Sequence, residues 1–195
     1  MSNSPQHKVI VGISGASGSA YGIAMLEALR EVERVESHLV VSASGYLTVS
    51  TETGMKKSQL EALADVVHDD RNVGASIASG SFPSLAMIIA PCSMKTLGCI
   101  AQGIGSSLMT RSADVILKER RRLILLARET PLNLAHIRNM AAVTEMGGIV
   151  YPPVPAFYSN PPDIDTMVRE TVGRVLNLAG IDNALYEPWQ GLGSN

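Results

Sequence analysis

Short apolar runs and longer amphipathic segments alternate along the chain. Continuous apolar runs bounded by glycine or proline are typical of buried parallel strands, whereas apolar residues at helical spacing indicate helices. The pattern predicts strands at 8–13, 38–42, 85–90, 123–127 and 148–151. It predicts helices at 21–31, 94–102, 107–120, 132–145 and 163–179. This alternation indicates an α/β fold with a doubly wound, open parallel sheet between two helical layers.

Two segments lack this pattern. Residues 65–84 are polar with glycine and serine, so we expect irregular structure there. Residues 152–162 contain five prolines and are expected to form an extended, stiff loop. Neither interrupts the alternating series, so residues 1–195 are expected to form one domain. Within it, residues 163–195 would be a C-terminal helix and an aromatic tail that packs over the site or against a neighbouring subunit.

The chain carries few charges for its size. Charged residues make up 17% of the 195 positions and hydrophobic residues 46%, against about 25% charged residues in typical domains. We therefore expect that part of the surface is buried between subunits of a homo-oligomer. The formal net charge of −2 provides no electrostatic attraction to nucleic acid or to an anionic membrane.

The sequence predicts a cytoplasmic protein without a membrane insertion. No apolar run approaches the ~18 residues that cross a bilayer, and the polar N-terminal stretch is too short for a signal peptide. Cys92 and Cys99 match no zinc or redox motif and suit a reducing compartment. The four histidines show no metal-ligand spacing, so no metal site is expected.

Small hydroxyl groups, glycines and a few cations follow the predicted strands. In open parallel sheets, ligands bind beyond the carboxyl ends of the strands. We therefore expect the functional site on this rim. It would be built from Ser14 to Gly18, Ser42, Ser44, Cys92 to Thr96, Arg128, Glu129 and Tyr158.

The first strand-to-helix turn, residues 12–18, has the sequence Gly-Ile-Ser-Gly-Ala-Ser-Gly. Free backbone N–H groups at such a turn favour an anion. The turn lacks the Gly-Lys-Ser/Thr ending of a P-loop and the spacing of a dinucleotide fingerprint, and the second strand ends in Ser42 without a ribose-binding acid. A mononucleotide phosphate, as in FMN, fits better than NAD. The alternative is a tight turn that binds no ligand.

Other polar groups also have two interpretations. Residues 91–96 open a helix whose N–H groups could hold a second edge of a ligand, but Ser93 could also be an ordinary cap with Lys95 in solvent. Arg111 and Lys118 share a helix face, although Lys118 could pair with Asp114 four residues earlier.

The last helix and the tail leave similar alternatives open. Arg174 lies on the polar side of the predicted helix 163–179 and could simply be solvent-exposed. Most of the eight aromatic residues fall in the last quarter of the chain, where they could form a lid that excludes water. They could equally pack against the body of the protein or a neighbouring subunit.

Taken together, these segments resemble the UbiX-like flavin prenyltransferases. The N-terminal half of the pattern comprises residues 12–18, Tyr21-Gly22, Thr51-Glu52-Thr53, Ser79-Gly80-Ser81 and Pro91-Cys-Ser-Met-Lys-Thr-Leu97. The C-terminal half comprises 111–121, Arg128-Glu129, Pro131-Leu132, Asn139-Met140, Pro152-Pro153, Phe157-Tyr158, Gly173-Arg174 and Trp189. Each piece alone is weak, but the ordered series covers nearly the whole chain and is specific.

The resemblance implies a Rossmann- or flavodoxin-like three-layer sandwich of the flavoprotein type that binds reduced FMN as a co-substrate. FMN would contact Gly15, Ala16, Ser17, Ser42, Ser93, Met94, Lys95, Thr96 and Arg128. The second substrate would be dimethylallyl monophosphate. Its phosphate would be held, partly across a subunit contact, by Arg111, Lys118, Glu129, Tyr158 and Arg174. The resemblance further implies a dodecamer, no metal, and a UbiD-like decarboxylase that uses the prenylated FMN.

The chemistry suits these residue types. An allylic phosphate leaves as a dianion, which cationic side chains stabilise, and the remaining allylic cation needs a dry, π-rich surface such as Trp189. In the family mechanism flavin N5 attacks first and C6 closes the ring, with Glu129 as our candidate proton relay. The expected catalytic residues are Ser17, Lys118, Glu129 and Trp189.

Two alternatives and two departures from the family pattern remain. An FMN-dependent cysteine decarboxylase shares the first turn, but it would carry a catalytic histidine in the first helix, which this chain lacks. A non-catalytic FMN carrier is the other alternative.

Ser106-Ser107 stands where an asparagine is common, and Phe82-Pro83-Ser84 is an unusual sequence after Ser-Gly-Ser. Both departures could alter the loop around the substrate.

Overall fold

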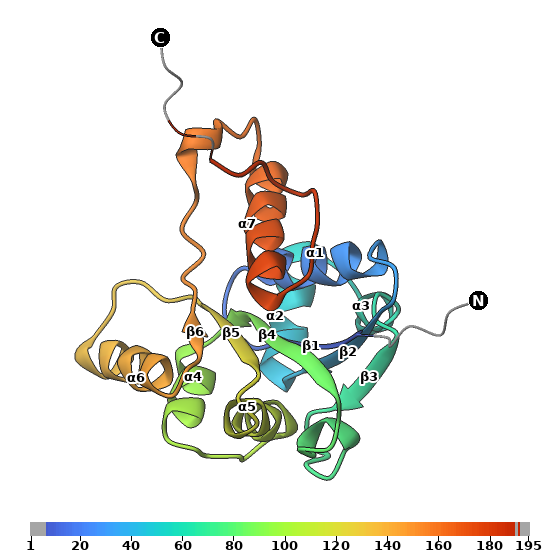
Figure 1. The fold of residues 1–195 in the computed structure, drawn as a ribbon, viewed down its shortest axis with the longest axis vertical. Coiled ribbons are helices and arrows are strands. Elements are labelled where there is room, and N and C mark those ends of the chain that lie inside the picture. The colour runs from blue at the N-terminus through green and yellow to red at the C-terminus, as the bar shows by residue number, and fades with distance from the viewer. Residues whose placement is uncertain (1–6, 190, 192–195) are drawn as a thin grey trace.

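A computed structural model describes residues 7–189 and 191 and contains a six-stranded parallel sheet (Figure 1). The strand order is β3-β2-β1-β4-β5-β6. The strands are β1 (His7–Ile13), β2 (Val35–Val41), β3 (Val66–Asp69), β4 (Ser84–Cys92), β5 (Arg122–Ala127) and β6 (Ile149–Val150). The order reverses between β1 and β4, and this switch point is where open α/β sheets bind ligands.

The central strands are apolar at almost every position because both faces of the sheet are covered. Successive side chains alternate between two separate hydrophobic clusters. Val9, Val11 and Ile13 of β1 belong to one cluster, whereas Ile10 belongs to the other. Strands β2, β4 and β5 alternate in the same way. The predicted doubly wound sheet is therefore confirmed.

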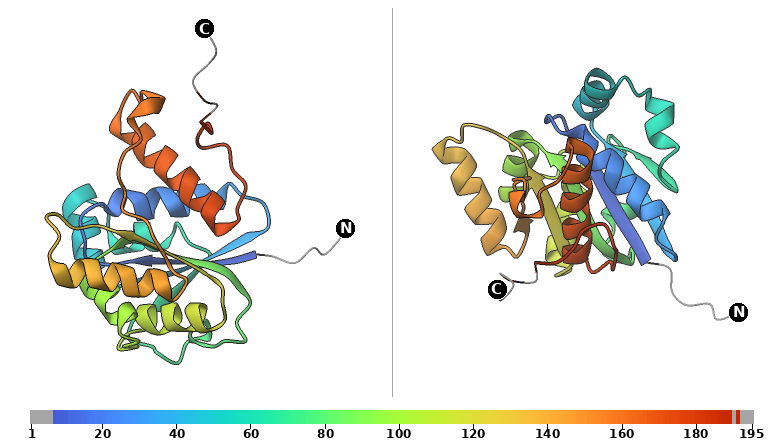
Figure 2. Two further views of the ribbon diagram at one scale, coloured as in Figure 1. Left: turned by 60° about the vertical axis from the view of Figure 1, so that its left-hand side comes forward. Right: turned by 90° about the horizontal axis from the view of Figure 1, so that it is seen from above.

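The two helical layers lie on opposite faces of the sheet (Figure 2). One face carries α1 (Ser19–Arg30), α2 (Ala43–Thr53), α3 (Lys57–Glu61) and α7 (Ile164–Ala179). The other face carries the 3₁₀ helix η1 (Ser76–Ala78), α4 (Met94–Ala101), α5 (Leu108–Lys118) and α6 (Leu134–Glu145). Helices α1, α5 and α7 each bury one apolar side against the sheet, as the helical spacing predicts. Helix α6 buries only Val143, and α2 buries little beyond Val49.

The segment 65–84 is more regular than the sequence analysis expects. It contains the edge strand β3, which pairs in parallel with β2, and the 3₁₀ helix η1. The prediction of irregular structure there is therefore wrong for these residues. Strand β3 is short and polar because, as an edge strand, it is covered on one side only, and the alternating pattern of its burial reflects this.

The proline-rich segment after β6 leaves the sheet and rises beside α7 (Figure 1). It ends in a short 3₁₀ helix, η2 (Phe157–Ser159), which the sequence did not predict. After α7 the chain returns along the helix through Tyr186 and Trp189. Part of the predicted aromatic tail, residues 190 and 192–195, lies outside the described residues. In the part of the chain that the structure describes, no helix is both long and apolar enough to span a bilayer.

Candidate functional site

A buried serine joins the carboxyl ends of β1 and β4. The hydroxyl of Ser14, which directly follows β1, donates a hydrogen bond to the carbonyl of Pro91 at 2.9 Å. It accepts another from the backbone N–H of Ser93 at 2.7 Å. Ser14 is 1% exposed. This bridge fixes the two turns at the switch point of the sheet relative to each other.

Three helices begin around one cavity of about 220 Å³ at this edge of the sheet. Each has a serine cap: Ser42 accepts from Gly45 N before α2, Ser93 from Thr96 N before α4, and Ser107 from Thr110 N before α5. The cavity is lined by Gly15, Ser42, Ser44, Asp70, Ser93, Lys95, Thr96, Cys99, Ser106, Ser107, Met109 and Thr110. Small hydroxyl groups, one cation and helix N-termini therefore dominate its wall.

The N-termini of α2 and α4 keep open hydrogen-bond donors. Among the described residues, no hydrogen bond is recorded for the backbone N–H groups of Ala43, Ser44, Met94 and Lys95. The Lys95 side chain is exposed and forms no ion pair with another described residue. Open N–H groups at two helix N-termini and a nearby ammonium group favour an anion. A mononucleotide phosphate fits this part of the cavity.

Asp70 closes the cavity on the side of α5. Its carbonyl accepts a hydrogen bond from Leu108 N at 2.7 Å, and its carboxylate accepts one from Met109 N at 2.9 Å. The first N–H groups of α5 are thus already satisfied, so this helix is less suited than α2 and α4 to hold a ligand anion. Asp70 also ties the end of β3 to the helix that carries Ser107 and Thr110.

Gly15 allows the first turn to approach α2 closely. A Cβ atom at this position would lie 2.3 Å from Ser44 Cβ and 3.2 Å from the Ser44 carbonyl carbon. Both residues line the cavity, so their close packing defines part of its wall. Gly18, the cap residue of α1, has φ 102°, a left-handed conformation that favours glycine.

The N-terminus of α1 binds a carboxylate of the chain itself. Glu52 on α2 accepts hydrogen bonds from Gly18 N at 3.1 Å, from Ser19 N at 2.9 Å and from the Ser19 hydroxyl. Burial acts to raise the pKa of Glu52, but hydrogen bonds from Ser19 and Ser17 outweigh it and lower the pKa. The N–H groups of Gly18 and Ser19, which the sequence analysis expects to be free for a ligand anion, are therefore occupied by Glu52.

Arg128 and Glu129 follow β5 on the same edge of the sheet. The backbone N–H of Arg128 donates to the carbonyl of Cys92 at 3.1 Å, which places it next to the turn that contains Ser93. The Glu129 carboxylate accepts from the N–H of Thr130 at 3.0 Å. Both side chains are exposed. The neighbouring Cys92 is fully buried, and burial raises the pKa of its thiol, so it is not a nucleophile at neutral pH.

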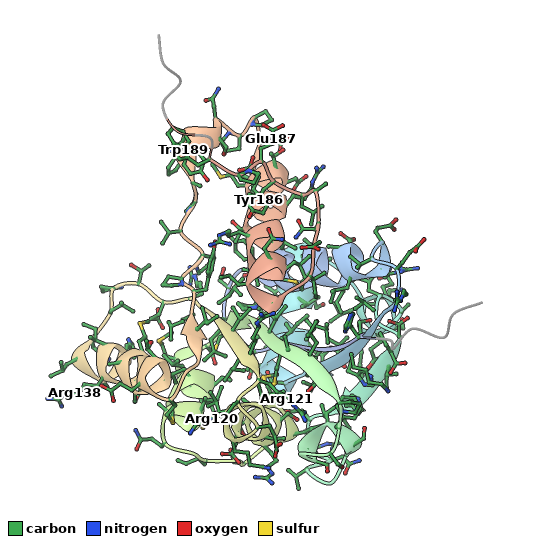
Figure 3. The ribbon with its side chains drawn as sticks, viewed as in Figure 1. Arg120, Arg121, Arg138, Tyr186, Glu187 and Trp189 are labelled. Carbon is green, nitrogen blue, oxygen red and sulfur yellow. The ribbon has the colours of Figure 1, made fainter. Side chains whose placement is uncertain are left out.

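A second cavity, also of about 220 Å³, lies between the proline-rich segment, α7 and the tail. Its lining includes Tyr151, Tyr158, Ser159, Glu170, Arg174, Tyr186 and Glu187. The rings of Tyr158 and Trp189 meet edge to face with centroids 5.1 Å apart. Tyr186, Glu187 and Trp189 cluster at the outer end of α7 in Figure 3. Burial raises the pKa of Tyr151, and the nearby Arg174 opposes this rise.

Neither Arg111 nor Lys118 lines either cavity, although Arg111 directly follows Thr110, which lines the first. Helix α5 starts at the carboxyl edge of the sheet and its 11 residues carry the chain about 16 Å toward the opposite edge. There Lys118 pairs with Glu119, and not with Asp114, which pairs with Arg111 at 2.6 Å. Figure 3 shows Arg120 and Arg121, just beyond α5, far from Trp189. One chain therefore does not bring Lys118 near Tyr158.

The structure thus gathers some of the expected residues and separates others. Five of the expected FMN ligands line the first cavity: Gly15, Ser42, Ser93, Lys95 and Thr96. Ala16, Ser17 and Arg128 lie in the adjoining turns, and Met94 is the first residue of α4. Tyr158 and Arg174 share the second cavity. The sequence analysis did not select Asp70 or Cys99 for the first cavity. The available signal for Asp70 was the pair Val66-Val67, which opens the short strand that ends just before it.

Comparisons with known proteins agree with this architecture. The Flavoprotein family matches residues 1–177. The flavin prenyltransferase UbiX of Neisseria meningitidis is 53% identical over 185 residues, which cover 95% of this chain and 97% of that protein.

Two solved structures are also similar along almost the whole chain. A crystal structure of AnUbiX (PadA1) in complex with FMN and dimethylallyl pyrophosphate has a TM-score of 0.93 and 45% identity, and it covers 96% of this chain and 100% of that chain. A dodecameric FMN-dependent UbiX-like decarboxylase from Escherichia coli O157:H7 has a TM-score of 0.91 and 45% identity, with 94% and 100% covered. This chain therefore belongs to the Flavoprotein family and, within it, to the UbiX-type flavin prenyltransferases.

Proposed function

We propose that this protein joins the dimethylallyl group of dimethylallyl monophosphate to N5 and C6 of reduced FMN. The observation that carries the proposal is the cavity at the switch point of the sheet, where α2 and α4 present open N–H groups beside Lys95. Such a site suits the phosphate of a mononucleotide. The FMN and dimethylallyl pyrophosphate bound by AnUbiX support both ligand classes.

The first cavity is the proposed FMN site. Ser42, Ser93 and Thr96 would position the flavin with the backbone of Gly15, Ala16, Ser17 and Met94, and Lys95 and Arg128 would supply positive charge. Reduced FMN supplies the nucleophilic ring atoms of the reaction. The hydroxyl of Ser17 interacts with Glu52, so the turn that faces the flavin is held in place from α2. We propose that Ser17 assists catalysis from this fixed position.

The second cavity is the proposed site for the allylic phosphate. Tyr158 offers a hydroxyl and Arg174 a guanidinium group, which grips a phosphate through two parallel hydrogen bonds. Trp189, edge to face with Tyr158, would provide an aromatic surface for the allylic cation. Glu129, exposed just after β5 at the carboxyl edge of the sheet, would accept the proton released when the ring closes.

Arg111 and Lys118 fit this scheme only across a subunit contact. Both are cations with acidic partners on their own helix or next to it, and neither lines the cavity that contains Tyr158. A neighbouring subunit would bring its own pair to the phosphate. The dodecameric UbiX-like protein of Escherichia coli supports a homo-oligomer, and we propose a dodecamer for this chain.

The remaining proposals concern the cellular setting. We propose that residues 1–195 act as one flavin-binding domain that needs no metal for the reaction. The free thiols of Cys92 and Cys99 support a reducing, cytoplasmic location. The prenylated FMN would be passed to a UbiD-like decarboxylase.

Mass spectrometry tests the proposed reaction. The protein would be mixed anaerobically with reduced FMN and dimethylallyl monophosphate, and the flavin would be extracted. A flavin heavier by a five-carbon unit supports prenyl transfer. Unchanged flavin in the presence of bound FMN would instead favour a carrier, and loss of carbon dioxide from a cysteine-containing peptide would favour the cysteine decarboxylase. Dimethylallyl diphosphate in a parallel reaction determines which donor is preferred.

A further inference from the structure

The short helix that carries Tyr158 is fastened to α7 by one side-chain hydrogen bond. The hydroxyl of Ser159 donates to Glu170 Oε2 at 2.7 Å, and it also lies 3.0 Å from the carbonyl of Ala156 in its own turn. Ser159 and Glu170 both line the second cavity. The position of Tyr158 over α7 therefore depends on this contact and on the ring of Trp189.

Glu170 has another natural partner that it does not use. Arg174 lies four residues later on α7, the spacing at which a glutamate and an arginine on a helix attract each other. The chain forms such a pair between Lys57 and Glu61, with N and O atoms 3.6 Å apart. Among the described residues, however, no ion pair is recorded for Arg174. Its side chain is exposed and lines the same cavity.

This arrangement matters for anion binding. A guanidinium group that already pairs with a carboxylate attracts a phosphate dianion less strongly, because the carboxylate offsets its charge. The carboxylate also repels the dianion directly. In this structure Glu170 Oε2 accepts from Ser159, and no ion pair with Arg174 is recorded among the described residues, so the charge of Arg174 remains available. Glu187 and Arg169 are also close, since Glu187 lines the cavity and Arg169 lines the adjoining groove with Glu170. No hydrogen bond is recorded from Ser159 to Glu187 or to Arg169.

We propose that Ser159 and Glu170 are positioning residues for the phosphate of the prenyl donor. Their hydrogen bond holds the turn of Tyr158 on α7 and keeps the Glu170 carboxylate from neutralising Arg174. This inference rests on the proposed function of the second cavity, but it concerns the binding of a phosphate, which can be measured without turnover.

The test uses the whole oligomeric protein loaded with FMN and compares three variants. Ser159→Ala frees Glu170 to pair with Arg174, so KM for dimethylallyl monophosphate should rise about tenfold, which corresponds to about 1.4 kcal/mol, while kcat falls much less. Glu170→Gln keeps an oxygen acceptor for Ser159 but removes the charge, so it should bind the donor more tightly than the wild type. The double variant Ser159→Ala/Glu170→Gln should recover most of the affinity lost in Ser159→Ala.

This recovery distinguishes the proposal from simple loosening of the turn. If the turn alone matters, the double variant will bind as weakly as Ser159→Ala, and the proposal is wrong. An unchanged KM in Ser159→Ala would also overturn it. Ser159→Thr is the matched control because it keeps the hydroxyl group, and it should behave like the wild type.

A calorimetric titration with inorganic phosphate separates this inference from the proposed reaction. The dissociation constant for phosphate should rise in Ser159→Ala and return in the double variant, even if the wild type forms no prenylated flavin. If the protein prenylates FMN but all variants bind phosphate with the same affinity, the proposed function stands and the proposed role of Ser159 and Glu170 is wrong.

Discussion

Ser14 and Ser93, 79 positions apart, are joined by a hydrogen bond of 2.7 Å from the backbone N–H of Ser93 to the hydroxyl of Ser14. The Ser14 hydroxyl itself donates a hydrogen bond to the carbonyl of Pro91, so one buried side chain bonds to two backbone groups. Because Ser93 caps the helix whose N-terminus opens onto the cavity, this contact links the end of β1 to the proposed flavin site.

Replacing Ser14 by alanine should destabilise the protein and weaken FMN binding. The Ser93 N–H loses its recorded partner in a buried place, which costs about 1–3 kcal/mol, whereas the Pro91 carbonyl keeps the hydrogen bond from the backbone N–H of residue 14 at 3.2 Å. Urea unfolding and a fluorescence titration with FMN measure both effects. Ser112→Ala is the matched control, because the Ser112 hydroxyl is equally buried and has no hydrogen-bond partner among the residues that the structure describes. The interpretation of Ser14 is wrong if the two variants are equally stable.

Gly15→Ala should abolish FMN binding before it unfolds the protein. The new Cβ would lie 2.3 Å from Ser44 Cβ, so the first turn and the start of α2 must move apart, and both line the cavity. The dissociation constant of FMN is expected to rise by at least about 100-fold, equivalent to about 2.7 kcal/mol. Gly74→Ala is a suitable control, since its new Cβ would meet only the Asn72 side chain at 3.6 Å. Tight FMN binding by Gly15→Ala would contradict this account of the cavity.

Glu52→Gln should lower stability at neutral pH but not in acid. The pKa of Glu52 is lowered in the folded protein, because hydrogen bonds from Ser19 and Ser17 outweigh the effect of burial. Its contribution is therefore present above the unfolded pKa of about 4.3 and is lost as the pH falls through the lower folded value. Denaturant midpoints of the two proteins should differ at pH 7 and approach each other as the pH falls below about 4.3. A constant difference across this range would show that the charge of Glu52 is not responsible.

The sheet was predictable because its strands are covered on both faces. An unbroken apolar run such as that of β1 or β4 indicates a buried parallel strand. Strand β3 gave no such signal, since only four residues at the edge of the sheet are involved and they alternate between half-buried and exposed. Helix α2 has many serine and threonine residues and buries little beyond Val49, so its ends are defined by the Ser42 cap and the left-handed Gly54 instead of by a pattern.

The candidate site was predictable as far as it follows from strand order. Residues after β1, β2 and β4 meet because parallel strands bring their carboxyl ends together, and Gly15, Ser42 and Ser93 do line one cavity. Asp70 also follows a strand at this edge, but it was missed because the sequence analysis did not predict β3. Glu52 could not be found from strand order, because it lies on α2 and reaches the first turn through a contact distant in sequence. The separation of Lys118 from Tyr158 depends on the direction in which α5 runs, which residue types do not reveal.

Glu129→Gln should leave FMN bound and slow product formation. The side chain follows β5 at the edge of the sheet, is exposed, and bonds only to the next backbone N–H in the described part of the chain, so its loss should not disturb the cavity. If Glu129 relays the proton of ring closure, the rate of prenylated flavin formation should fall about 100-fold or more, as for loss of a general base. Stopped-flow absorbance under anaerobic conditions follows this step. Unchanged turnover would remove Glu129 from the mechanism.

A pair of histidines should make the fold sensitive to mild acid. His38 Nδ1 and His68 Nε2 are 3.0 Å apart, and Nε2 of His38 lies 2.7 Å from the Glu36 carboxylate. A proton on Nε2 of His38 leaves Nδ1 to accept from His68. Burial lowers the pKa of both rings, although Glu36 opposes this effect at His38.

The unfolded chain therefore takes up protons at higher pH than the folded protein does, and the free energy of unfolding should fall as the pH drops below about 6.5. The pair joins β2 to the edge strand β3, so weakening it should first loosen the strand that leads to Asp70. In a His68→Gln variant the amide N–H still reaches His38 but cannot be protonated, so urea midpoints between pH 7.5 and pH 5 should change less than in the wild type. An identical pH dependence in both proteins would place the acid-sensitive group elsewhere in the fold.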